Sequence, residues 1–180
     1  MLANYVAHGW MAAIGLTWFF LLGRRFPIGS LNRRMRPWYI AALVLIAVSV
    51  GETIASPLSA GFHVPALPTL IVQLVFLAFV VGPTEEVLFR GVIQTGLKAS
   101  FGQSGIVIGA LLFGLFHLIN LATESLGATL LQVFTATVIG LLFGVLYDRT
   151  RNLVGASLAH SVADFSATAI PLFAYLFANR

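Results

Sequence analysis

The chain has 180 residues, of which 59% are hydrophobic and 9% are charged, and its mean hydropathy is +0.96. Soluble globular chains carry about 25% charged residues, so this composition excludes an ordinary soluble domain and indicates a membrane protein. The absence of cysteine also excludes disulfides, thiolate metal sites and a cysteine nucleophile.

Positive charge is concentrated near the N-terminus. Five of the ten basic residues lie between two apolar runs, at Arg24, Arg25, Arg33, Arg34 and Arg36. Basic residues in a short connection between spans mark the cytoplasmic side of a membrane. We therefore interpret the sequence pI of 10.1 as a sign of topology, and we expect no nucleic-acid partner.

Six apolar segments follow one another along the chain, and most are close to the ~20 residues that a helix needs to cross a bilayer. The third is the longest, so it extends beyond the bilayer or tilts strongly. The first has no basic stretch before it, and we expect a retained span there instead of a cleavable signal. The predicted helices are Tyr5–Gly23, Pro37–Ala55, Leu67–Leu97, Ser104–Leu121, Leu126–Tyr147 and Leu153–Phe177.

The later connections predict the orientation of these helices. Lys98 follows the third segment, and Arg149 and Arg151 follow the fifth, whereas residues 56–66 and 122–125 contain no Lys or Arg. Because basic connections stay in the cytoplasm, we expect both termini outside.

Small residues recur at a spacing of four in the later segments, as in the pairs Gly105 with Gly109 and Gly140 with Gly144. This spacing permits close approach of helices in lipid. With no internal repeat or low-complexity tract, residues 1–180 are expected to form a single integral membrane domain, a compact bundle with about six spans.

Charge interrupts the third segment at Glu85, Glu86 and Arg90. An acid at the centre of a span costs roughly 2.5 to 3.5 kcal/mol, so acids there usually face the bundle interior and serve a function. Glu86 and Arg90 are four residues apart and can neutralise each other on one helix face. Glu85 points roughly 100° away, which leaves it as the candidate catalytic group.

The fourth segment places a histidine at the depth of this acid. The interval in sequence from Glu85 to Lys98 equals the interval from Ser104 to His117, and Lys98 and Ser104 flank the same turn. At about 1.5 Å per residue, Glu85 and His117 are both ~20 Å from that turn. We therefore expect Glu85 and His117 to be level with each other.

The last segment adds His160 and Asp164, which share a helix face at a spacing of four. His160 follows Leu153 by seven residues, which predicts a shallower depth of ~10 Å on the same side. A carboxylate and two imidazoles can activate water for amide hydrolysis and donate to the oxyanion that forms. No serine or cysteine nucleophile is then required.

These motifs, in this order, resemble the CPBP family of CAAX proteases and bacteriocin-processing membrane proteins, also called the Abi family. The family pattern is Glu-Glu-x-x-x-Arg, Phe-x-x-x-His and His-x-x-x-Asn or a close variant, and the resemblance covers residues 67–170, the expected catalytic core. The matching stretches here are Glu85 to Arg90, Phe113 to His117 and His160 to Asp164.

The resemblance implies an all-α polytopic bundle with the activity of a glutamate-dependent intramembrane endopeptidase, similar to the prenyl-protein endopeptidases that trim CAAX tails. By position, Glu85 with His117 activates the water, and Glu86 with Arg90 organises the site. The implied partners are membrane lipids and a protein or peptide substrate, lipidated or with a C-terminal membrane anchor. The short chain resembles bacterial or archaeal members, which implies a prokaryotic cytoplasmic membrane.

The third motif departs from the commonest family pattern, which has Asn where this chain has Asp164. The resemblance implies that His160 and the residue at position 164 stabilise the oxyanion. An ionised Asp cannot donate a hydrogen bond. Asp164 therefore either orients His160 or stays protonated.

Other functions stay open at this point. No cofactor is expected, but two imidazoles and a carboxylate could also hold zinc. Buried acids also occur in proton-coupled transporters, and the same residues could merely stabilise a non-catalytic binding or bacteriocin-immunity protein. His8 has no motif partner in the sequence, so we expect it to have a packing role.

Overall fold

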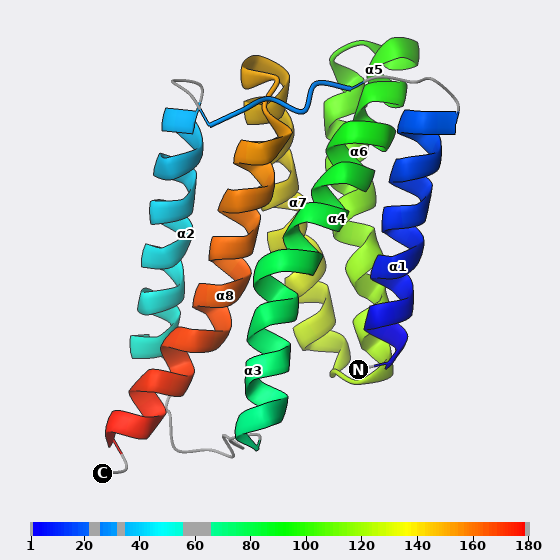
Figure 1. Ribbon diagram of the computed structural model, residues 1–180. Coiled ribbons are helices and arrows are strands. Elements are labelled where there is room, and N and C mark those ends of the chain that lie inside the picture. The colour runs from blue at the N-terminus through cyan, green and yellow to red at the C-terminus, as the bar shows by residue number, and fades with distance from the viewer. Residues whose placement is uncertain (1, 22–25, 32–34, 56–65, 179–180) are drawn as a thin grey trace.

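The protein is a bundle of helices in the computed structural model, which describes residues 2–21, 26–31, 35–55 and 66–178 (Figure 1). Within those residues there are helices and no strands, as the sequence predicts. The elements are α1 (Leu2–Leu16), η1 (Thr17–Leu21), α2 (Arg36–Ala55), α3 (Leu67–Phe76), η3 (Leu77–Val81), α4 (Gly82–Glu86), η4 (Val87–Gln94), α5 (Thr95–Phe101), α6 (Ser104–Phe116), η5 (His117–Ala122), α7 (Leu126–Thr150) and α8 (Leu153–Ala178).

Four helical stretches are long and apolar enough to cross a membrane, and each agrees with a predicted segment. The longest has 35 residues and is the third predicted segment, which continues through α3, η3, α4, η4 and α5. In the described part of the chain, the first two predicted spans are shorter apolar helices, so the number of six spans stays a prediction. The four stretches are Leu67–Phe101, Ser104–Ala122, Leu126–Thr150 and Leu153–Phe177, and the shorter helices are Val6–Leu21 and Arg36–Gly51.

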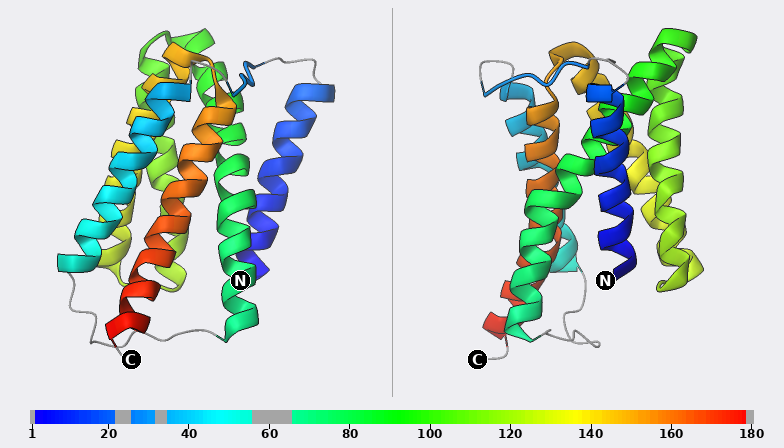
Figure 2. Two further views of the ribbon diagram at one scale, coloured as in Figure 1. Left: turned by 60° about the vertical axis from the view of Figure 1, so that its left-hand side comes forward. Right: turned by 45° about the vertical axis from the view of Figure 1, so that its right-hand side comes forward.

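The long third helix runs through the middle of the bundle, as Figures 1 and 2 show. α2 packs against α8 on one side, α1 packs against α4 and η4 on the other, and α6 pairs with α7. The N-terminal end of α1 and the C-terminal end of α8 lie at the same end of the bundle (Figure 1). Residues 24, 25, 33, 34 and 56–65, on which the predicted orientation partly depends, lie outside the described residues.

Glycines set the close approach of the later helices. A Cβ atom at Gly105 would lie 2.6 Å from the backbone of Leu97, and one at Gly144 would lie 2.9 Å from Ile106 Cγ2. Neither distance is compatible with a side chain. The predicted use of small residues for helix packing is therefore confirmed for these two contacts.

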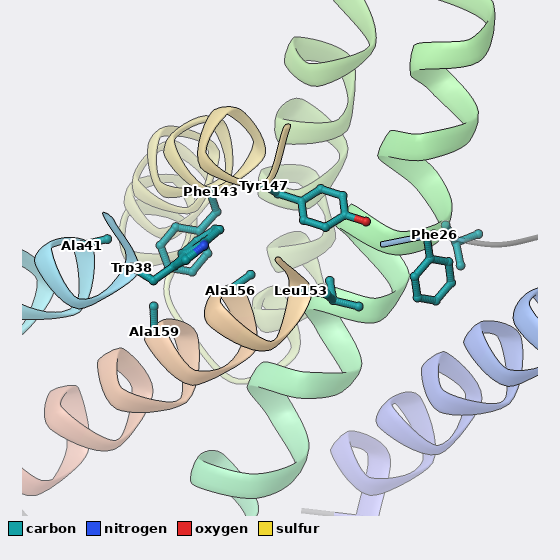
Figure 3. Packing of buried hydrophobic residues seen from close by; sticks show 9 residues of the cluster. Phe26, Trp38, Ala41, Phe143, Tyr147, Leu153, Ala156 and Ala159 are labelled. Atoms are coloured by element: carbon teal, nitrogen blue, oxygen red, sulfur yellow. The ribbon is translucent and has the colours of Figure 1, made fainter. Parts of the chain in front are cut away.

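The largest buried apolar cluster joins α2, α7 and α8 with the segment 26–31 (Figure 3). Trp38 lies edge-on to Phe143, with ring centroids 5.3 Å apart, and its indole N–H donates to the Thr150 hydroxyl at 3.1 Å. The Tyr147 hydroxyl donates to the carbonyl of Pro27 at 3.2 Å. This cluster holds α7 and α8 together beneath the segment 26–31 and so positions the part of α8 that carries the site histidine.

Candidate active site

The 35-residue helical stretch Leu67–Phe101 changes its winding on both sides of the acidic pair Glu85 and Glu86. α4 lies between the two π-helical segments η3 and η4. Pro83 has no N–H to donate to the helix ladder, and the Thr84 hydroxyl donates to the carbonyls of Val80 and Val81 at 2.7 and 3.1 Å. A π segment inserts an extra residue into a turn and so redirects the side chains that follow, and such segments are frequent at functional sites.

Gly82 brings this part of the helix against α8. A Cβ atom at Gly82 would lie 2.6 Å from Ser161 Oγ and 2.8 Å from the Ser161 backbone nitrogen. Because no side chain fits in that gap, glycine sets the separation of α4 and α8. Glu85 and Glu86, one turn further along, consequently meet His160, which directly precedes Ser161.

Glu86 is fully buried and has two charged or polar partners. Its Oε1 accepts a hydrogen bond from His160 Nδ1 at 2.8 Å, and Arg90 Nε lies 3.1 Å from its Oε2. Oε2 has no aligned hydrogen-bond donor among the described residues, so the contact with Arg90 is an ion pair only. The Arg90 guanidinium also lies 4.4 Å from the centre of the Phe113 ring and donates to the Gly140 carbonyl at 3.5 Å. The Glu86–Arg90 pair predicted from the spacing is confirmed.

Glu85 is 5% exposed and faces two imidazoles from different helices. Its Oε1 accepts a hydrogen bond from His8 Nε2 of α1 at 3.2 Å, and its Oε2 lies 3.8 Å from His160 Nε2 of α8. The expectation that His8 only packs is wrong, because this histidine contacts a motif carboxylate. His8 is 6% exposed, and it is the site residue that sequence reasoning missed.

A comparison of depths, counted in residues from the end of each helix, could have identified His8 as a site residue. The interval in sequence from His8 to Leu21, where η1 ends, is the same as the interval from Glu85 to Lys98. The same count that pairs Glu85 with His117 therefore also places His8 at their level.

The predicted depth of His160 is wrong. Counting residues from Leu153 places His160 about 10 Å closer to the basic end of the bundle than Glu85. Its ring nevertheless contacts both glutamates. The count assumed that α6 and α8 begin at the same height. The contact between α4 and α8 shows instead that α8 begins closer to the level of the acidic pair than α6 does.

A cavity of about 250 Å³ lies beside Glu85, between α1, α3, η3 and η5. His117 lines the same cavity as Glu85, and the described residues include no hydrogen bond or ion pair between them, so they meet only across this space. His117 Nδ1 lies 3.0 Å from the Phe113 carbonyl, which can only accept. Nδ1 therefore carries a proton, and Nε2 is the acceptor whenever the ring is neutral. The polar wall residues are His8, Gln73, Glu85, His117 and Asn120.

Asp164 lies one turn beyond His160, with Oδ2 3.6 Å from His160 Nε2. That separation is longer than a hydrogen bond, and Oδ2 has no hydrogen-bond partner among the described residues. The structure thus brings Asp164 next to His160, as the spacing predicts, while its role stays a prediction. In the described part of the chain, no group of three His, Cys, Asp or Glu side chains is arranged to hold a metal ion.

The family of the chain follows from a comparison with known proteins. Residues 67–166 match the family described as type II CAAX prenyl endopeptidase Rce1-like, which is more than half of the 180 residues. Neither the curated proteins nor the solved structures contain a match. The matched region contains all six site residues predicted from the sequence and leaves α1 and α2 outside it. With helices apolar enough to span a membrane, the chain is an integral membrane protein that belongs to the Rce1-like family of type II CAAX prenyl endopeptidases.

Proposed function

We propose that the protein hydrolyses a peptide bond in a membrane-associated or lipidated protein, with water activated by Glu85 and His117. Membership of an endopeptidase family supports the reaction class. The observation that carries the assignment of residues is the shared cavity: Glu85 and His117 line it from opposite helices, and the ion pair with Arg90 is made by Glu86 instead. Glu85 is thereby left available as a base.

In the proposed reaction the water oxygen attacks the carbonyl carbon of the peptide bond. The Glu85 carboxylate takes one water proton, and His117 Nε2 accepts a hydrogen bond from the same water. The carbonyl oxygen becomes an oxyanion. When the C–N bond breaks, Glu85 returns its proton to the leaving amine, so the products are a carboxylic acid and an amine with the enzyme unchanged.

The neighbouring groups supply the remaining requirements. Glu86 accepts from His160 Nδ1 and so directs Nε2 toward Glu85. We assign the protonated His160 ring, which carries an N–H at both Nδ1 and Nε2, the role of oxyanion donor through Nε2, a kind of contact worth about 10² to 10³ in kcat. Asp164, 3.6 Å from the same nitrogen, orients the ring. Each step uses groups of this chain and no cofactor.

The test is cleavage of peptides that end in a prenylated CAAX sequence by detergent-purified protein. Glu85→Gln and His117→Ala should each lower kcat/KM by at least about 10²-fold, because a positioned general base contributes that much. The matched control is Glu124→Gln, since Glu124 is exposed in the turn before α7. Wild-type cleavage by either site variant would contradict the assignment.

Two further measurements test the alternative functions and the need for a lipid anchor. The same peptides without the prenyl group show whether a lipid anchor is needed. Metal content and chelator sensitivity, measured on the same samples, test the zinc alternative: activity lost to chelation and restored by zinc would overturn the metal-free reaction. A folded wild type that cleaves none of the peptides would favour the binding or transport functions.

A further inference from the structure

The first helix contributes a group to the site, although the motif residues of the site all lie in the matched region. α1 packs on α4 and η4, and its residues Ala7 and His8 form part of the cavity wall beside Glu85. His8 is 77 positions before Glu85 in the chain, and their side chains join inside the bundle. A polar contact buried at this depth in a membrane bundle is costly unless both groups are satisfied, which points to a function.

The packing around α1 positions the His8 ring. The ring lies edge-on to Phe76, with centroids 5.3 Å apart and planes at 79°. Gly15 lies seven residues after His8, on the same face of α1, and a Cβ atom there would overlap Val87. This glycine lets α1 lie close against η4 and so sets the position of His8 along Glu85.

The chemistry of the two groups shows which of them donates the hydrogen bond. A carboxylate oxygen only accepts, so His8 Nε2 carries the proton and donates to Glu85 Oε1. This bond restricts rotation of the carboxyl group about its last torsion. The second lone pair of Oε1 and the whole of Oε2 stay available to a water or to His160.

We propose that His8 is a positioning residue for hydrolysis: its hydrogen bond to Glu85 Oε1 holds the carboxylate toward the cavity in the orientation that accepts the water proton. The inference rests on the proposed role of Glu85. It makes α1 a part of the active site and predicts that the matched core alone does not supply the whole of it.

The experiment compares three substitutions at His8 in the full chain, with prenylated CAAX peptide as substrate. His8→Gln places an amide N–H at the position of Nε2, so it keeps the bond, whereas His8→Asn places its N–H one position short, and His8→Leu has none. We expect a loss in kcat of about 10- to 100-fold in the Asn and Leu variants, with KM unchanged, and recovery to within about threefold in the Gln variant. Ile14→Ala, at a half-exposed position of α1, is the control for general damage to that helix.

Several results would overturn the inference. Equal kcat values for the Gln and Asn variants would mean that polarity or size matters and not the donor position, and unchanged kcat in His8→Leu would remove the role altogether. A rise in KM alone would make His8 a substrate contact. If His8→Leu does not fold, the Gln and Asn pair still decides the question, since both are amides.

A parallel series separates this inference from the proposed function. In the Glu85→Gln background, His8→Leu should cause no further loss, because the bond acts only through the Glu85 carboxylate. If Glu85→Gln itself retains wild-type activity, the proposed function fails whatever His8 does. If Glu85→Gln is inactive while His8→Leu is fully active, only the role of His8 fails.

Discussion

At the scale of single residues, Arg90 compensates the buried negative charge of Glu86. Its side chain is 2% exposed, and its guanidinium forms an ion pair with Glu86 and lies over the Phe113 ring. Burying two charges is expensive, and the cost is offset only while each has its partner. The hydrogen bond from His160 gives Glu86 a second partner and couples the pair to α8.

Replacing Arg90 should therefore destabilise the protein as well as inactivate it. Arg90→Met keeps the length of the side chain but leaves the Glu86 carboxylate buried without its cation, so we expect the free energy of unfolding to fall by about 3 to 5 kcal/mol. Arg149→Met, at an exposed position near the end of α7, should change it by no more than about 0.5 kcal/mol. Unfolding of both variants in detergent, monitored against wild type, gives the comparison, and equal losses would contradict it.

At the scale of elements, the broken helix from α3 to α5 is the part that builds the site. Its π segments and Pro83 interrupt the regular ladder around α4, and Gly82 presses this turn against α8. The i, i+4 relation of Glu86 and Arg90 survives the change of winding. The spacing argument therefore holds for neighbouring turns, while the winding itself has no clear signature in the sequence apart from the proline.

Two glycines of this helix provide a matched test of that packing. Gly82→Ala introduces a Cβ atom 2.6 Å from Ser161 Oγ, so α4 and α8 must separate, at an expected cost of about 1 to 3 kcal/mol. The accompanying displacement of the carboxylates should lower kcat by up to about 10²-fold. Gly96→Ala meets no atom within 4 Å and should instead stabilise the helix by up to about 1 kcal/mol. Thermal unfolding and peptide cleavage of both variants test this, and normal activity in Gly82→Ala would show that the α4–α8 separation is not critical.

At the scale of the whole molecule, the two ends of the bundle differ in charge. The turn after α5 follows Lys98, which pairs with Asp148, and α7 ends beside Arg149 and Arg151. The turn between η5 and α7 contains no Lys or Arg. We propose that the basic end is cytoplasmic and that both termini lie outside.

The absence of cysteine makes this orientation directly measurable. Gln103→Cys and Glu124→Cys place single thiols at exposed positions on the opposite ends of α6 and η5. In intact cells, a membrane-impermeant maleimide should label Glu124→Cys and should label Gln103→Cys only after the membrane is opened, because basic connections stay in the cytoplasm. The reverse pattern would invert the proposed topology.

Hydropathy and spacing are enough to find the helices and the residues of the motifs. Apart from the predicted end at Gly23, which lies outside the described residues, the bounds of the six predicted segments agree closely with the helices. The Glu86–Arg90 pair is also present. Both follow from the sequence because length, apolarity and side chains one turn apart are properties of a single helix. The contact of His8 with Glu85, the level of His160 and the cavity between Glu85 and His117 depend on how separate helices pack. Their relative heights and rotations are set by close contacts such as Gly82 against Ser161 and Gly15 against Val87, which join residues far apart in the chain and leave no periodic signal within either helix.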